Sequence, residues 1–172
     1  MDQLSMSSAR LRNSIITTRD RRQELLEAYL KRDYPATVFL SLNIPGTEKN
    51  PPGAESLFSR ALHGFFTAFP DAGMLARDRD LLGPYAFISL NQDPACVKRR
   101  CIDMESADPF ARLIDFDIFN ESGCQVGRAA LGLPPRSCLV CDLPAVECIR
   151  LRRHGAAEVK GRADELLALC RD

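Results

Sequence analysis

Several features that mark common protein classes are missing from this 172-residue sequence. Lysine plus arginine and aspartate plus glutamate balance at 23 each, so the overall charge gives no reason to expect a nucleic-acid binder. No apolar run approaches the about 18–20 residues of a membrane span, and no apolar segment follows the first charges as in a secretory signal. Internal repeats are absent, which excludes solenoids and propellers. We therefore predict a cytoplasmic protein whose partners include neither nucleic acid nor membrane.

The remaining composition is that of an ordinary globular domain, with 45% hydrophobic and 27% charged residues. This length suits one domain with a substantial core. Seven cysteines without an export signal indicate a reducing compartment with free or metal-bound thiols. We expect a single domain over residues 19–172, preceded by an N-terminal arm at residues 1–18 that is loosely held or partly helical.

Hydrophobic periodicity predicts helices that alternate with strands. Apolar positions at helical spacing indicate helices at residues 18–31, 53–69, 94–104, 143–153 and 156–170. Short β-branched or aromatic runs indicate strands at residues 36–42, 85–90 and 112–119, and a turn at 120–123 leads into a hairpin partner at 124–128. This order predicts an α+β (or α/β) fold with a small mixed sheet flanked by helices.

Two carboxylates, Asp115 and Asp117, stand two residues apart in the mainly apolar run RLIDFDIF. Successive side chains of a strand point to opposite faces, so these two emerge side by side while Ile114, Phe116 and Ile118 anchor the other face. Adjacent carboxylates repel each other unless a cation lies between them, and oxygen ligands of this kind suit Mg²⁺. The pair is therefore a candidate site for Mg²⁺-dependent phosphoryl or nucleotidyl transfer. A strand at the sheet edge with a solvated acidic face is the alternative.

A longer series of motifs resembles one family. Its pattern runs R-L-x-D-x-D, a glycine and an arginine, L-P-P-R-x-C-L-x-C, and then an alanine, a cysteine, an arginine and a histidine. The matching residues here are Arg112, Leu113, Asp115, Asp117, Gly123, Arg128, Leu133–Arg136, Cys138, Leu139, Cys141, Ala145, Cys148, Arg150 and His154. Upstream, Arg19–Gln23 and the loop Asn43–Gly46 with Lys49 match more weakly. The chain resembles the citrate lyase holo-synthase (CitX) family from about Arg19 onward.

The resemblance implies a transferase that matures an acyl carrier protein. Members attach 2′-(5″-triphosphoribosyl)-3′-dephospho-CoA to a serine of the apo citrate lyase carrier subunit and release pyrophosphate. By analogy of chemistry, we expect a nucleotidyltransferase-like core with the D-x-D pair facing a polyphosphate cleft. A similar transferase with a D-x-D pair serves malonate decarboxylase, so that system's carrier protein is the alternative acceptor.

Basic residues near the pair are candidates for binding the triphosphate, because guanidinium groups bind phosphate in a bidentate manner. Pro134 and Pro135 give Arg136 a stiff approach, which makes this arginine the candidate clamp for the leaving pyrophosphate. Arg112, Arg128, Arg153, His154 and Lys49 are further candidates for substrate binding. The run Lys98–Arg100 is as consistent with a solvated helix face as with a functional basic patch.

The segment Cys138-x2-Cys141-x6-Cys148-x5-His154 supplies three thiols and an imidazole. Tetrahedral zinc accepts a Cys₃His set, and a C-x-x-C spacing lets both sulfurs reach one metal. Buried free cysteine is also a common packing residue, and His154 is alternatively a general base for the carrier serine. We favour packing and substrate binding over zinc here. A non-catalytic, zinc-stabilised binding module is the functional alternative from another class.

Overall fold

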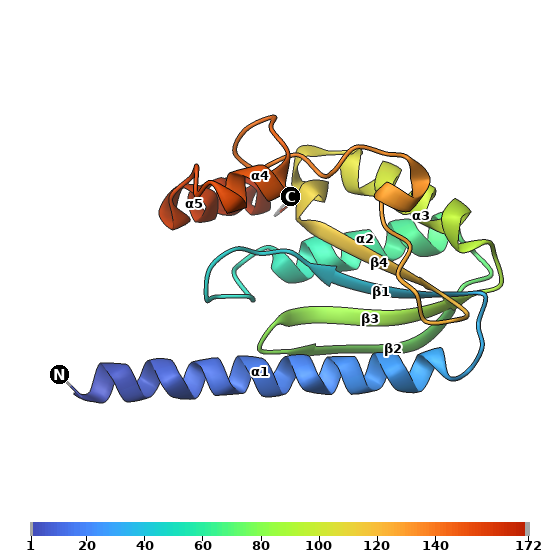
Figure 1. Cartoon of the computed structure of the whole chain (residues 1–172), viewed down its shortest axis with the longest axis horizontal. Helices are drawn as coiled ribbons and strands as arrows, with labels where there is room; N and C mark the ends of the chain where they lie inside the picture. Colours follow the sequence, from blue (N-terminus) through green and yellow to red (C-terminus); the bar gives the residue numbers. More distant parts are fainter. Residues whose placement is uncertain (1, 171–172) are drawn as a thin grey trace.

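The protein is a four-stranded sheet with helices on both faces (Figure 1). The computed structural model describes the backbone of residues 2–170 and the side chains of residues 10–170. The strands are β1 (Ala36–Leu42), β2 (Gly73–Asp80), β3 (Gly83–Leu90) and β4 (Ile114–Asn120). Their order in the sheet is β2-β3-β1-β4, and every neighbouring pair is antiparallel. The two edges of the sheet are therefore β2 and β4.

Five α-helices and two short 3₁₀ helices complete the described fold. They are α1 (Asp2–Leu30), α2 (Ala54–Ala68), α3 (Pro94–Ser106), η1 (Pro109–Leu113), η2 (Ala129–Leu131), α4 (Ala145–Arg150) and α5 (Ala156–Ala168). Figure 1 shows α1 along the opposite side of the sheet from α2 and α3. Among the described residues, no helix combines the length and the apolar character that a membrane crossing requires.

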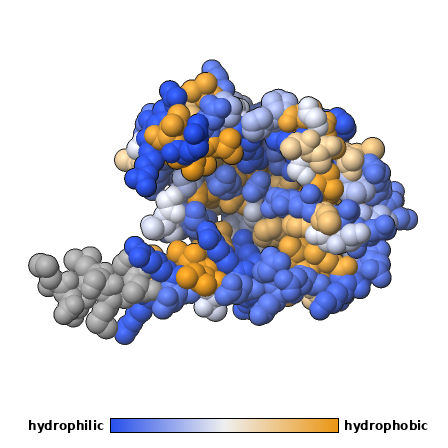
Figure 2. All heavy atoms as spheres, viewed as in Figure 1, coloured by the Kyte–Doolittle hydropathy of each residue, from blue (hydrophilic) through white to orange (hydrophobic). Residues whose placement is uncertain are grey.

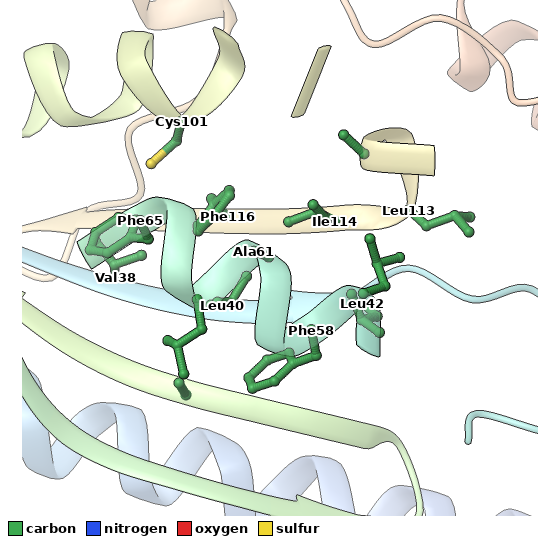
Figure 3. Close-up of a cluster of buried hydrophobic side chains, with 14 of the residues drawn as sticks. Val38, Leu40, Leu42, Phe58, Ala61, Phe65, Cys101, Leu113, Ile114 and Phe116 are labelled. Carbon is green, nitrogen blue, oxygen red and sulfur yellow. The ribbon is translucent and has the colours of Figure 1, made fainter. Parts of the chain in front are cut away.

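The main core lies between the sheet and helices α2, α3 and α5. The wide apolar stripe of α2 faces the sheet, and Figure 3 shows Phe65 of α2 beside Val38 of β1 and Phe116 of β4. The rings of Phe65 and Phe116 stack with centroids 5.5 Å apart, and both side chains are fully buried. The apolar side chains that alternate along β4 therefore point into this core and anchor the strand, as the sequence predicts.

The opposite face of the sheet carries a smaller aromatic cluster under α1. Tyr29 of α1 packs against Phe87 with ring centroids 5.2 Å apart, and Phe87 stacks on Phe39 of β1. The guanidinium of Arg22 lies 4.3 Å from the centroid of the Tyr85 ring, and the residue as a whole is 8% exposed. This helix thus covers the face to which the D-x-D carboxylates belong, since Asp117 is the cross-strand neighbour of Phe39.

The α+β class is confirmed, and the expected small sheet is antiparallel throughout rather than mixed. Strand β2 is an element that the sequence did not predict. Its sequence GMLARDRD is largely charged and exposed, because an edge strand packs little of its surface. The expected hairpin partner at 124–128 is reduced to one bridge between Phe119 and Gln125.

The N-terminal helix is longer than the sequence predicts. A helix was expected from residue 18, but α1 runs without interruption from Asp2 to Leu30. No helix end marks the expected boundary between residues 1–18 and 19–172. That division into an arm and a domain stays a prediction.

Candidate active site

The D-x-D pair lies on edge strand β4, with the two faces of the strand divided as predicted. Ile114, Phe116 and Ile118 are buried, whereas Asp115 and Asp117 are half-buried on the other face. Gln125 donates a 2.6 Å hydrogen bond from Nε2 to Oδ1 of Asp117. The carboxylates therefore lie in a partly desolvated position instead of on a fully solvated acidic face.

Both carboxylates have raised pKa values. Burial raises the pKa of Asp117 to about 6, and the neighbouring Asp115 carboxylate contributes in the same direction. Burial also raises the pKa of Asp115, although Arg136 acts against that shift. Burial thus disfavours the charged form of this pair, and a cation beside it would favour that form.

Arg136 lies where its guanidinium reaches over the edge of β4. Its Nη2 donates a 2.7 Å hydrogen bond to the carbonyl of Ile114 and lies 2.9 Å from Oε2 of Glu105. Its Nη1 lies 3.6 Å from Oδ1 of Asp115. The predicted catalytic residues Asp115 and Arg136 are therefore in direct contact, and the backbone of β4 sets the position of the arginine.

A buried charge cluster on α3 closes the same edge of the sheet. Glu105 accepts a 3.0 Å hydrogen bond from the backbone N–H of Phe116, and Lys98 donates a 2.5 Å bond to the carbonyl of Phe116. Arg128 Nη2 lies 3.3 Å from the second oxygen of Glu105, on the same carboxylate that Arg136 contacts. One buried carboxylate thus orients two of the arginines expected to bind phosphate.

Two cavities share the wall formed by Arg112, Arg136 and Ser137. One, of about 600 Å³, is lined by four arginines around Glu105: Arg112, Arg128, Arg136 and Arg162. The other, of about 640 Å³, lies against α4 and α5 and includes apolar side chains from Leu139, Ile149 and Val159. Figure 2 shows the surface hollowed between these C-terminal helices and the rest of the fold. A basic cavity thus adjoins a less polar one, with Arg136 between them.

The remaining predicted binding residues fall into two groups. Arg112 donates from Nη2 to the carbonyls of Ser137 and Cys138, so it braces the loop that carries Arg136. Arg153 is exposed, and its neighbour Arg152 lines the second cavity. Lys49 donates to the carbonyl of Ile44, and burial lowers its pKa. The geometry thus joins Arg112 to the site and gives no such support to Arg153 or Lys49.

The four residues of the predicted zinc motif converge in space. The ligand atoms of Cys138, Cys141, Cys148 and His154 all lie within 4.8 Å of one another. His154 Nε2 lies 3.3 Å from Cys141 Sγ, so its imidazole faces the thiols. This orientation favours a ligand over a general base as the role of His154.

The sequence did not predict Glu105, left Lys98 open between a solvated helix face and a functional basic patch, and did not predict Gln125. A signal for the first two was present, because residues seven apart lie on one helix face and both flank the buried stripe that includes Cys101. A buried charge at such a position needs a partner. Gln125 left no signal, because its contact with Asp117 depends on the turn after β4.

Comparisons with known proteins agree with the resemblance seen in the motifs. The family model described as "Apo-citrate lyase phosphoribosyl-dephospho-CoA transferase" matches residues 11–169. A curated protein of that name from Citrobacter koseri is 27% identical over 157 residues, which cover 89% of this chain and 86% of the relative. Proteins of that name from Escherichia coli strains O1:K1 / APEC and O139:H28 show the same identity and coverage. The chain therefore belongs to the apo-citrate lyase phosphoribosyl-dephospho-CoA transferase family, and it is an enzyme of the transferase class.

Proposed function

We propose that this enzyme attaches 2′-(5″-triphosphoribosyl)-3′-dephospho-CoA to a serine of the apo citrate lyase acyl carrier protein and releases pyrophosphate. The names of the relatives support the donor class and the citrate lyase acceptor. The observation that carries the chemistry is the half-buried pair Asp115 and Asp117, with Arg136 3.6 Å from the first carboxylate. Family membership favours this reaction over a non-catalytic binding module.

The donor set fits a divalent cation. Asp115 and Asp117 offer adjacent carboxylate oxygens on one face of β4, and burial raises the pKa values of both, a cost that a bound cation would offset. Oxygen ligands of this kind suit Mg²⁺. When bound, Mg²⁺ would neutralise charge on the polyphosphate of the donor.

The arginines supply binding and charge stabilisation for the same group. Arg112, Arg128 and Arg136 line the basic cavity, which is the better match for a triphosphate. Arg136 is positioned by the carbonyl of Ile114 and by Glu105, so it needs little reorganisation as negative charge moves to the leaving pyrophosphate. The adjoining cavity with Leu139 and Ile149 is the candidate location for the less charged part of the donor.

In the proposed step, the serine Oγ forms a bond to the α-phosphorus and its proton is released to solvent. The bond from the α-phosphorus to the oxygen that bridges to the β-phosphate breaks, and pyrophosphate departs with those electrons. Chemistry of this kind asks the protein for positioning and charge stabilisation more than for covalent participation.

The test is intact-mass spectrometry of purified apo carrier protein after incubation with this enzyme, the donor and Mg²⁺. We expect a mass gain equal to the donor minus pyrophosphate, which disappears when Mg²⁺ is omitted. Modification of the malonate decarboxylase carrier alone would replace the proposed acceptor. No gain on either carrier, with a donor that a characterised relative uses, would refute the proposal.

A further inference from the structure

The fold brings a Cys₃His cluster together beside the proposed active site, from segments that regular secondary structure holds weakly. Cys138 and Cys141 lie in the loop between η2 and α4, Cys148 lies on the six-residue helix α4, and His154 precedes α5. We propose that these four side chains bind one structural Zn²⁺ ion, which holds the Arg136 loop in position.

The spacing of the ligand atoms matches a tetrahedral site. Zinc–sulfur bonds of about 2.3 Å and zinc–nitrogen bonds of about 2.0–2.1 Å place neighbouring ligand atoms about 3.5–3.8 Å apart. Cys141 Sγ lies 3.5 Å from Cys148 Sγ and 3.3 Å from His154 Nε2, and the whole set falls within 4.8 Å. Only small side-chain movements separate this arrangement from tetrahedral coordination.

The surroundings of the cluster are those of a metal site. His154 Nδ1 lies 3.3 Å from Oε1 of Glu158, one helical turn further along the chain. A carboxylate on Nδ1 leaves Nε2 free to coordinate, which is the usual arrangement around a zinc-bound imidazole.

Hydrophobic packing does not account for this region. The only buried residue of α4 is Cys148, whereas Val146 is 62% exposed and Ile149 is 76% exposed. A six-residue helix is too short to be stable by itself. A metal that ties Cys148 to the Cys138–Cys141 turn supplies the constraint that burial does not.

A disulfide explains the geometry less well. Cys141 and Cys148 are close enough in space to be oxidised to one, but a disulfide needs only two sulfurs. The convergence of Cys138 and of the imidazole on the same point would then have no function. A metal uses all four ligands.

The site would act on the loop that carries Arg136. The backbone N–H of Cys138 donates a 2.7 Å bond to Leu143, and that of Ala145 donates a 2.9 Å bond to the carbonyl of Arg136. Arg112 donates to the carbonyl of Cys138 from the other side. Zinc at Cys138 would thus lie two residues from Arg136, the proposed phosphate clamp. This effect on the clamp rests on the proposed function, whereas zinc binding itself does not rest on it.

Metal analysis of untagged protein tests the site. We expect one zinc per chain by elemental mass spectrometry after desalting, and loss of that zinc in Cys148→Ser and His154→Ala. Cys124→Ser and Cys96→Ser remove exposed thiols outside the cluster and serve as matched controls that keep the metal. Replacement of zinc by Co²⁺ in the wild-type protein should give the intense visible bands of tetrahedral cobalt and a sulfur-to-cobalt charge-transfer band.

Two results would overturn the proposal. One is a folded, fully reduced wild-type protein that takes up neither Zn²⁺ nor Co²⁺. The other is a native Cys141–Cys148 disulfide, seen as a mass lower by two hydrogen atoms. A zinc-loaded protein that modifies no carrier would refute the proposed function and leave the site standing, whereas a protein that takes up no zinc and transfers at full rate with Mg²⁺ would refute the site alone.

Discussion

The sheet carries two D-x-D pairs, one on each edge strand, and they differ in their partners. Asp78 and Asp80 lie on β2, and Asp115 and Asp117 lie on β4. Both pairs belong to the face that α1 covers, because one cross-strand neighbour of each pair, Tyr85 or Phe39, is in the aromatic cluster under that helix. Sequence spacing, strand position and sheet face are therefore the same for the two pairs.

The partners of the two pairs separate a structural role from a functional one. Arg22 donates two hydrogen bonds to the carboxylate of Asp80, 2.6 and 2.8 Å long. Asp117 has a neutral partner in Gln125, and burial raises its pKa to about 6. One carboxylate of each pair thus contacts an arginine. The pairs differ in desolvation, because burial raises the pKa of both carboxylates on β4. A cation would offset that cost, which makes the β4 pair the one suited to a ligand.

The largest expected effect is on transfer. Asp117→Ala and Asp115→Ala should each lower the initial rate of carrier modification by at least about 10²–10³-fold, because they remove ligands that act on the charge of the reacting phosphates. Asp78→Ala, the matched change on β2, should leave the rate unchanged. Intact-mass time courses measure all three. Equal losses on both strands would show that the comparison has no functional meaning.

Glu105→Ala should cause the largest loss of stability, about 3–5 kcal/mol, because it leaves Lys98, Arg128 and Arg136 without their shared buried carboxylate. Chemical denaturation followed by circular dichroism measures the free energy of unfolding. Glu121→Ala, in the exposed turn after β4, serves as the control and should change it by less than about 0.5 kcal/mol. A loss no larger than that of the control would contradict the anchoring role of Glu105.

Asp80→Asn should separate stability from transfer on β2. The substitution weakens the charged hydrogen bonds to buried Arg22, so the free energy of unfolding should fall by about 1–3 kcal/mol. The rate of carrier modification at a temperature where the variant is folded should stay at the wild-type value. Unchanged stability combined with lost transfer would reverse the roles assigned to the two pairs.

The smallest effect is a pH dependence of stability in Mg²⁺-free buffer. Asp117 has a pKa of about 6 in the folded protein against 3.8 as the ordinary value, so the native state binds the extra proton between these limits. Stability from this group should therefore fall as pH rises from about 4 to 6 and then level off. Asp117→Asn should flatten that slope and raise the thermal midpoint at pH 8 more than at pH 4. A variant that is less stable at pH 8 would contradict this sign.

Periodicity predicted the elements that bury a face. β1 was predicted with its observed bounds, Ala36–Leu42, and the bounds of α2 were predicted within one residue. Both elements carry apolar residues at the spacing that a buried strand or helix requires. β2 was missed because its alternation is hidden by charges that an edge strand tolerates. The helix expected from residue 18 begins at Asp2, which the few apolar positions of that segment did not indicate.

The positions of the site residues were predictable where one element determines them and less predictable where several elements meet. Alternation along β4 predicted which face Asp115 and Asp117 share. The proline-stiffened motif predicted Arg136 as a phosphate clamp near the pair, but its contacts with Asp115 and Glu105 depend on how the loop and α3 pack against β4. The convergence of Cys138 with His154 likewise depends on the turn between them, which is why spacing alone favoured packing over zinc.

The contacts along the outer edge of β4 also govern how a partner can dock. Arg136 donates a hydrogen bond to the carbonyl of Ile114, and the N–H of Val126 donates one to the carbonyl of Ile118. Between them, Glu105 accepts from the N–H of Phe116 and Lys98 donates to its carbonyl. A strand from another molecule finds these backbone groups already used, so it cannot extend the sheet beside the D-x-D pair. In the proposed reaction, the carrier protein would therefore present its serine on a loop or a helix end that is recognised through side chains.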